Sequence, residues 1–213
     1  NHRMEINLGL EDLLRIAPLL VLFLTSLIPV GIKVLRGNQE PNQLVPLSVG
    51  AAGILISVML LWIFAGQGQT VFSRALIFDG LTFWSSTAAL VITMGALFLA
   101  YESTSTNKNL FSEFVFLLLS SALGMLILVS ALDLLITFIG LEIMSLSLYL
   151  LIAMGNEEKL SKEASFKYFL LGSLASAIML YGIAFIYGTT GTTYISDMVA
   201  SVPNLIETSR LFL

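Results

Sequence analysis

Long apolar stretches separated by short polar links dominate the chain. Six of these stretches have about twenty residues, which as helices would cross a hydrocarbon core about 30 Å thick. The fourth and fifth are joined by only a few residues, so they are predicted to form an antiparallel hairpin. The pattern predicts an all-α membrane protein, a polytopic transmembrane helix bundle. The predicted spans cover approximately residues 16–34, 45–64, 80–100, 110–129, 131–154 and 164–187.

The polar links divide the chain into four parts. Residues 1–15 are predicted to be an N-terminal segment, 16–100 the first three transmembrane helices, 110–188 helices four to six, and 189–213 a loop or amphipathic tail. Asp79, directly before the third span, is predicted to be its N-cap, since Asp side chains accept hydrogen bonds from the first free backbone N–H groups.

Composition agrees with a membrane protein and excludes several kinds of chemistry. The chain is 57% hydrophobic and 11% charged, whereas soluble domains carry about 25% charged residues. It has no cysteine and one histidine, His2, so we expect no metal site and no cofactor-binding site. The net charge of −4 and the absence of a basic run give no reason to expect a nucleic-acid partner. The lipid bilayer is the partner that the composition predicts.

Charge asymmetry between the links predicts the orientation. One set of links carries five cationic residues and the other carries three, and cytoplasmic links are enriched in Lys and Arg. The N-terminus is therefore predicted to lie outside and the link between spans five and six inside. The first set is Lys33, Arg36, Lys108, Lys159 and Lys162; the second is Arg3, Arg15 and Arg74.

The fifth span carries the most informative residue, Glu142. Ser130 and Asp133 resemble a capping box, which predicts a helix from about Ala131 to Met154. Glu142 then falls near the membrane midplane, where a carboxylate costs on the order of 3 kcal/mol to insert and usually has a function. The alternative is a structural glutamate that neighbouring helices satisfy.

Three further residues are candidates for a polar pathway. Ser145 and Tyr149 lie three and seven residues after Glu142, on the same helix face. They would either hold water beside the carboxylate or hydrogen-bond a neighbouring helix. Lys167 lies about 8 Å into the sixth span, where it would either relay charge towards Glu142 or extend its ammonium to the interface. Because their predicted depths differ by roughly 10 Å, a direct Glu142–Lys167 salt bridge is not expected.

Helix six also carries small residues at helical spacing. The pairs Gly172/Ser176 and Ser173/Ala177 have the small-xxx-small spacing that lets membrane helices approach closely. Packing alone accounts for both pairs.

Taken together, these motifs resemble a known family. Gly140-Leu-Glu142-Ile-Met-Ser-Leu, then Glu163-Ala-Ser-Phe-Lys167-Tyr-Phe-Leu-Leu-Gly-Ser, and the run from Leu180 to Gly188 are similar to the antiporter-like membrane subunits of complex I, the proton-translocating NADH:quinone oxidoreductase. The resemblance is most specific over about residues 134–191. Asp79-Gly80-Leu81 before the third span also fits the family.

The resemblance implies a fold, a role and partners. The family fold has two inverted repeats of five helices, and spans four to six would begin the first repeat. A glutamate matching Glu142 is paired in the family with a lysine on the seventh helix, so the chain looks like the N-terminal part of a longer subunit. It would belong to a non-redox subunit of a proton translocase in the bacterial inner membrane. Its partners would be other membrane subunits, while NADH, quinone, flavin and iron–sulfur clusters belong elsewhere in the complex.

Two other functions remain open from the sequence. Subunits of multi-subunit sodium/proton antiporters and of membrane-bound hydrogenases share the same ancestral helices. A purely structural membrane bundle, in which Glu142 is only a hydrogen-bond partner, is the alternative of a different class. Copurification with a peripheral NADH-oxidising arm, with a hydrogen-oxidising arm or with neither would distinguish the complex I, hydrogenase and antiporter functions. Full pumping in a Glu142→Gln variant would favour the structural bundle.

Overall fold

Six long helices cross the molecule in alternating directions. The computed structural model describes residues 10–39, 41–63, 69–71, 74–103, 108–155 and 158–201. Within these ranges six helices are long and apolar enough to span a membrane, which confirms the predicted all-α polytopic fold. They are α2 (Ala17–Leu35), α3 (Leu44–Ile63), α4 (Gly80–Glu102), α5 (Phe111–Ser130), α6 (Leu134–Ala153) and α7 (Glu158–Thr190).

Shorter elements lie at the ends of this bundle. The helix α1 (Leu10–Arg15) precedes α2, and the 3-10 turn η1 (Lys108–Leu110) leads into α5. The strands β1 (Gln69–Val71) and β2 (Leu76–Phe78) pair antiparallel, with Thr70 opposite Ile77. Residues 195–201 form a further short helix. The sequence pattern did not predict the β1–β2 hairpin.

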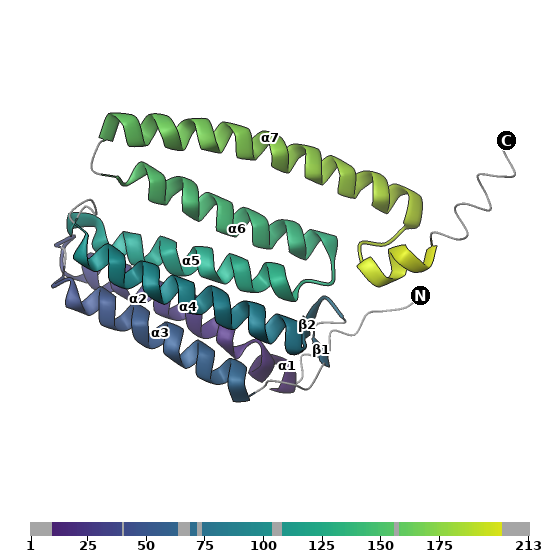
Figure 1. Ribbon diagram of the computed structural model, residues 1–213, viewed down its shortest axis with the longest axis horizontal. Coiled ribbons are helices and arrows are strands. Elements are labelled where there is room, and N and C mark those ends of the chain that lie inside the picture. The colour runs from purple at the N-terminus through teal and green to yellow at the C-terminus, as the bar shows by residue number, and fades with distance from the viewer. Residues whose placement is uncertain are drawn as a thin grey trace, which may run out of the picture.

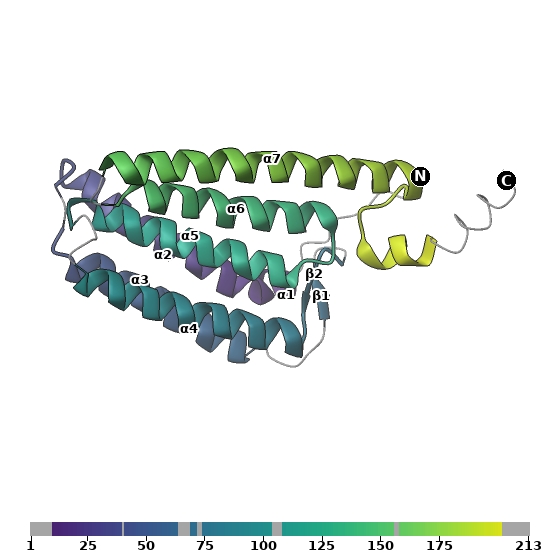
Figure 2. The ribbon, with the colours of Figure 1, turned by 45° about the horizontal axis from the view of Figure 1, so that its top comes forward.

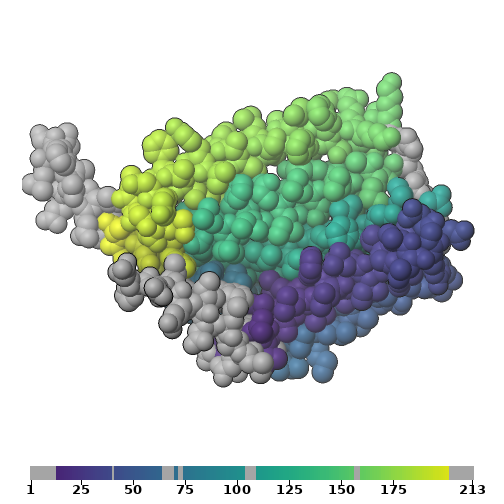
Figure 3. Space-filling model, turned by 180° about the vertical axis from the view of Figure 1, so that it is seen from behind, coloured from purple at the N-terminus to yellow at the C-terminus, as the bar shows by residue number. Residues whose placement is uncertain are grey.

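The helices α5, α6 and α7 lie side by side in chain order, with α6 in the middle (Figures 1 and 2). The helices α2, α3 and α4 pack on the other side of α5, where Leu22, Leu90, Val115 and Leu119 form a fully buried core. Seen from behind, α2 (purple) packs against α3 and α5, while α7 (green) follows the opposite edge of the molecule (Figure 3). Accordingly, 44% of the apolar stretch of α5 is buried inside the molecule, whereas only 6% of the apolar stretch of α7 is buried.

Two glycines bring α5 and α6 into backbone contact. A Cβ added to Gly124 would lie 2.6 Å from the backbone nitrogen of Met144 and 2.8 Å from the carbonyl oxygen of Gly140. A Cβ on Gly140 would lie 2.9 Å from the backbone nitrogen of Leu128. Because backbone atoms cannot move aside as a flexible side chain can, both positions require glycine. This contact holds α6 in place, and with it Glu142, which lies two residues beyond Gly140.

The predicted start of the fifth span is wrong by three residues. The helix α6 begins at Leu134, and Asp133 is its N-cap, accepting hydrogen bonds from the backbone N–H groups of Leu135 and Ile136. Ser130 instead closes α5, with its hydroxyl donating to the carbonyl oxygen of Leu126. A capping box needs both residues on one helix start, so the predicted Ser130–Asp133 box does not exist.

The sixth span is longer than predicted. The helix α7 starts at Glu158 and ends at Thr190, so Lys159 and Lys162 belong to its first turns rather than to a charged link. Charged residues extend the helix beyond the apolar window because they are good helix formers. Two other predictions fall partly outside the described residues: the N-terminal segment before Leu10, and the tail beyond residue 201.

At one bundle end, three segments are joined by hydrogen bonds. The α5–α6 link bonds the β hairpin through Leu132 N–H to the carbonyl oxygen of Ala75 at 2.9 Å. On its other side, Leu134 N–H donates to the carbonyl oxygen of Thr193 at 3.0 Å, and the Thr193 hydroxyl donates to Asp133. The Asp133 carboxylate therefore caps α6 and also binds the segment that follows α7.

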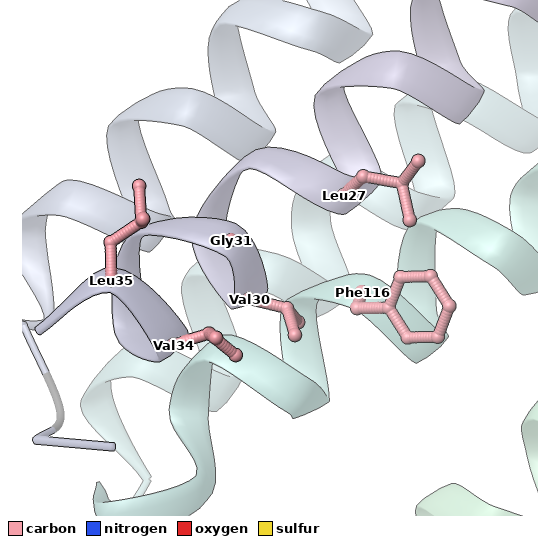
Figure 4. A pocket seen from close by; sticks show the side chains of 6 residues that line it. All are labelled: Leu27, Val30, Gly31, Val34, Leu35 and Phe116. Carbon is pink, nitrogen blue, oxygen red and sulfur yellow. The ribbon is translucent and has the colours of Figure 1, made fainter. Parts of the chain in front are cut away.

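An open groove on the outer surface is lined entirely by carbon. It measures about 500 Å³ and lies between α2 and α5, bordered by Leu27, Val30, Val34 and Phe116, with Gly31 at its floor (Figure 4). A proton-carrying site needs polar or ionisable groups, so this groove does not fit one.

Candidate functional site

Glu142 lies near the middle of α6, as predicted. It is the ninth residue of this helix, about 12 Å from the start and about 17 Å from the end at 1.5 Å per residue. No other charged residue occurs in the α6 sequence, and the Glu142 side chain is half-buried. A lone carboxylate at this depth needs a polar partner on a neighbouring helix.

That partner is Ser176, in the middle of α7. The Ser176 hydroxyl donates a hydrogen bond to Oε1 of Glu142, across the contact between the two helices. From the sequence, Ser176 is predicted only to be a small residue at a helix-packing position. Its spacing from Gly172 was the available signal, because that spacing places both residues on the face that approaches another helix.

Tyr149 lies two turns along the same face of α6 and packs directly beneath α7. A Cβ on Gly172 would lie 2.6 Å from Cζ of Tyr149 and still closer to its hydroxyl. The Tyr149 ring meets those of Tyr168 and Phe169 edge to face, with centroids 4.8 and 5.8 Å away. The carbonyl oxygen of Tyr149 accepts a 2.6 Å hydrogen bond from Ser165. These contacts place the Tyr149 ring in the packing between α6 and α7.

Ser145 lies between these two residues. It is half-buried, and at 100° per residue it points about 60° to one side of Glu142. It therefore lies at the edge of the α6–α7 contact rather than at its centre.

The structure does not bring Lys167 to Glu142. Lys167 precedes Ser176 by nine residues, which is about two and a half helical turns and places the two side chains on opposite faces of α7. The Lys167 ammonium forms a 2.6 Å ion pair with Glu163 one turn earlier, and its side chain is 69% exposed. This agrees with the expectation that no direct Glu142–Lys167 salt bridge forms.

Lys33 is a buried charge that the sequence pattern did not predict. Lys33 was assigned to the first polar link, but it lies in the last turn of α2 with its side chain only 9% exposed. Its ammonium contacts both carboxylate oxygens of Glu113 on α5, at 2.7 and 2.9 Å, and donates to the carbonyl oxygen of Asn109 at 2.8 Å. Because Glu113 neutralises the Lys33 charge, Lys33 adds little to the excess of positive charge from which the membrane orientation was predicted.

Ligands for a metal ion are not gathered in the part of the chain that the structure describes. There, no three His, Cys, Asp or Glu side chains lie close enough together to hold an ion. The chemistry that this arrangement supports is proton binding at Glu142. A carboxylate that is hydrogen-bonded to a hydroxyl can take up, hold and release a proton.

Comparison with known proteins finds relatives that match almost the whole chain. The sequence family described as NADH:quinone oxidoreductase/Mrp antiporter, TM matches residues 131–213. NADH-quinone oxidoreductase subunit N of Bdellovibrio bacteriovorus is 55% identical over 210 residues, covering 99% of this chain and 43% of that protein. The subunit N of Protochlamydia amoebophila is 33% identical over 208 residues, covering 97% of this chain and 43% of that protein. This chain therefore spans less than half the length of these relatives.

A solved structure shows the same fold. A chain of respiratory complex I from Thermus thermophilus, determined with bound aureothin, superposes with a TM-score of 0.69 at 28% identity. The superposition covers 83% of this chain and 38% of that one. By the family match, the identity across almost the whole chain and the shared fold, the chain is similar to the antiporter-like membrane subunits of NADH:quinone oxidoreductase.

Proposed function

We propose that this chain forms part of a proton half-channel in the membrane arm of a proton-translocating NADH:quinone oxidoreductase, with Glu142 as the carboxylate that takes up and releases the proton. The observation that carries the proposal is the position of Glu142. It is the sole charged residue of α6, lies near the middle of that helix and is hydrogen-bonded across to α7. A carboxylate at this depth is costly to insert into the membrane, so its presence points to a function.

The proton would reach Glu142 from water and leave it for a lysine. The family resemblance implies that this lysine lies on a following helix, in the part of the relatives that this chain does not cover. A nearby ammonium favours the ionised carboxylate, whereas desolvation favours the protonated one. Movement of the lysine charge away from Glu142 would therefore promote proton uptake.

The exposed face of α7 supports this arrangement. Nearly all of α7 outside its contact with α6 is uncovered, and this face carries the Lys167–Glu163 ion pair. We place the following helices of the full-length subunit against this face. Lys167 would then lie between α7 and those helices, where it would act on the input side of the pathway.

The wider assignment follows from the relatives. Proteins named subunit N of NADH-quinone oxidoreductase match almost the whole chain, so we assign the subunit to that enzyme as a non-redox component. Its partners would be the other membrane subunits. NADH, a quinone, flavin and iron–sulfur clusters would be used by other parts of the complex.

A second candidate is a subunit of a multi-subunit sodium/proton antiporter. The matching family is described as covering both NADH:quinone oxidoreductases and Mrp antiporters, and this specific observation keeps the candidate open. Purification of the full-length protein from its native membrane separates the two. An NADH-oxidising peripheral arm in the purified complex supports the first function, and its absence supports the antiporter.

The proposed location is the bacterial inner membrane with the N-terminus outside. Arg36 directly follows the end of α2, and Lys159 and Lys162 lie in the first turns of α7. All three are on the side assigned to the cytoplasm. An impermeant thiol label on a cysteine at position 160 should react only from the cytoplasm, and one at position 75 only from outside. The reverse labelling would overturn the orientation.

Quinone reductase activity in membranes tests the role of Glu142. Glu142→Gln keeps the shape and hydrogen bonding but removes ionisation, so activity should fall strongly while the complex still assembles. Glu142→Asp should retain part of the activity because it keeps the carboxylate. Gln43→Glu, in the polar link before α3, is a control for a charge change outside the site. Full activity in an assembled Glu142→Gln complex would contradict the proposal.

A further inference from the structure

The hydroxyl of Ser176 is the polar group that meets Glu142 at the contact between α6 and α7. We propose that Ser176 is a positioning residue for proton binding at Glu142, holding the carboxyl group at this contact in both its ionised and its protonated form. This inference rests on the proposed function, since it requires Glu142 to change its protonation state.

A serine hydroxyl suits both states because it has one donor and two acceptor positions. Towards the carboxylate it donates its O–H, which is the bond seen in the structure. When Glu142 binds a proton, the hydroxyl turns about its Cβ–Oγ bond and its oxygen accepts a hydrogen bond from the new O–H of the carboxylic acid. Ser176 keeps its own proton throughout, so the proton that arrives at Glu142 is the one that leaves it.

The packing of α7 on α6 fixes Ser176 at this height. Tyr149 lies against Gly172, one turn before Ser176, and the Ser165 hydroxyl donates to the carbonyl oxygen of Tyr149. A shift of α7 by one turn would move Ser176 about 5.4 Å along the axis, out of reach of Glu142. The Tyr149–Gly172 contact therefore sets the register that the Ser176–Glu142 hydrogen bond needs.

The charged residues of the surrounding helices point elsewhere. Lys167 and Glu163 pair with each other on the opposite face of α7. Glu113, the charged residue of α5, lies in the first turn of that helix and binds Lys33. The face of α6 that meets α5 is centred on Gly140, whose direction differs from that of Glu142 by about 160°. Within the described residues, the Ser176 hydroxyl thus donates a hydrogen bond to the Glu142 carboxylate.

The test uses three variants of the full-length subunit in its assembled complex. Ser176→Ala removes the hydroxyl, and Ser176→Thr restores one. Ser173→Ala is the matched control, because Ser173 lies on an exposed part of the same helix and donates to its own backbone at Leu170. Proton uptake should fall about tenfold in Ser176→Ala, the loss expected when a hydrogen bond to a charged group is removed. It should recover substantially in Ser176→Thr and stay unchanged in Ser173→Ala.

Infrared difference spectroscopy gives a readout that a purely structural role would not move. The carboxylic acid C=O band of Glu142 is identified by its absence in Glu142→Gln. In Ser176→Ala this band should shift to higher frequency, because the acid loses its hydrogen-bond partner, while Ser173→Ala leaves it in place.

The outcomes separate this inference from the proposed function. An unshifted Glu142 band with normal uptake in Ser176→Ala would overturn the role of Ser176 alone, provided that Glu142→Gln is inactive. Full activity in Glu142→Gln would instead overturn the proposed function and this inference with it. Equal losses in Ser176→Ala and Ser173→Ala would also contradict the inference, because they would indicate a general effect on α7.

Discussion

The ring of Tyr149 lies against the backbone of Gly172, so closely that a Cβ at position 172 would fall 2.6 Å from Cζ of the ring. This contact sets the height of α7 on α6 and brings Ser176 opposite Glu142. The Ser176–Glu142 hydrogen bond therefore depends on a packing contact made by Tyr149, seven residues beyond Glu142 on α6.

Substitution of Gly172 tests that dependence. Gly172→Ala should destabilise the α6–α7 pair by about 1–3 kcal/mol, the range for overpacking a tight contact. Gly182→Ala on the same helix should be neutral, because a Cβ there meets nothing within 4 Å. Thermal unfolding of the purified protein measures both. If Tyr149→Leu fails to rescue Gly172→Ala, the loss does not come from this contact.

The Lys33–Glu113 ion pair should contribute to stability rather than to proton transfer. Glu113→Gln removes the charge that faces a buried ammonium and should cost on the order of 3 kcal/mol. Lys33→Met should cost less, because the Glu113 side chain is 34% exposed and water can solvate it. The double variant Lys33→Met/Glu113→Leu should recover most of the loss. Additive losses in the thermal midpoints would mean that the two residues are not coupled.

Sequence patterns predicted the helices well and their contacts poorly. The six spans were recognisable because apolar runs of spanning length have few other interpretations. The start of α6 was misplaced because Ser130 and Asp133 fit a local motif that the chain does not use. The burial of Lys33 was missed because its partner is 80 residues away in the sequence.

The site was predictable only in part for the same reason. The depth of Glu142 follows from counting residues along one helix, but its partner depends on how a second helix is placed. The spacing of Gly172 and Ser176 predicted a close helix contact but did not identify the helix that they contact. Tyr149, which shares a face with Glu142, gave no signal that its ring packs under Gly172.

Asp79 should make the start of α4 sensitive to acid. Hydrogen bonds from the backbone and side chain of Thr82 hold the pKa of this carboxyl below its ordinary value. A lowered folded-state pKa means that the stabilisation is present above the pKa of the unfolded chain. It is lost as the pH falls through the lower folded value.

The pH dependence of the thermal midpoint checks this sign. Asp79→Asn keeps a capping oxygen but cannot ionise, so it should remove the contribution of residue 79 to the loss of stability below about pH 4. Asp79→Ala should lose about 1 kcal/mol at neutral pH, the usual contribution of an N-cap. An unchanged acid slope in Asp79→Asn would refute the assignment.

Lys167 should affect pumping only modestly. Its ammonium is paired with Glu163 on the face of α7 away from Glu142, so Lys167→Ala should slow quinone-coupled turnover by a small factor through the input side. Lys167→Glu, which places two negative charges one turn apart, should have a larger effect. If both variants match the wild type across the pH range, Lys167 has no input-side role and only extends to the membrane interface.

Proton uptake per pair of electrons, measured in sealed membrane vesicles containing fully assembled Glu142→Gln complex, tests the central claim most directly. We expect coupled uptake to fall strongly while the abundance of the complex equals that of the wild type, because a glutamine cannot bind and release a proton. Normal uptake in the assembled variant would contradict the claim that Glu142 is the titrating carboxylate. Failure to assemble would contradict it as well, by assigning Glu142 a structural role.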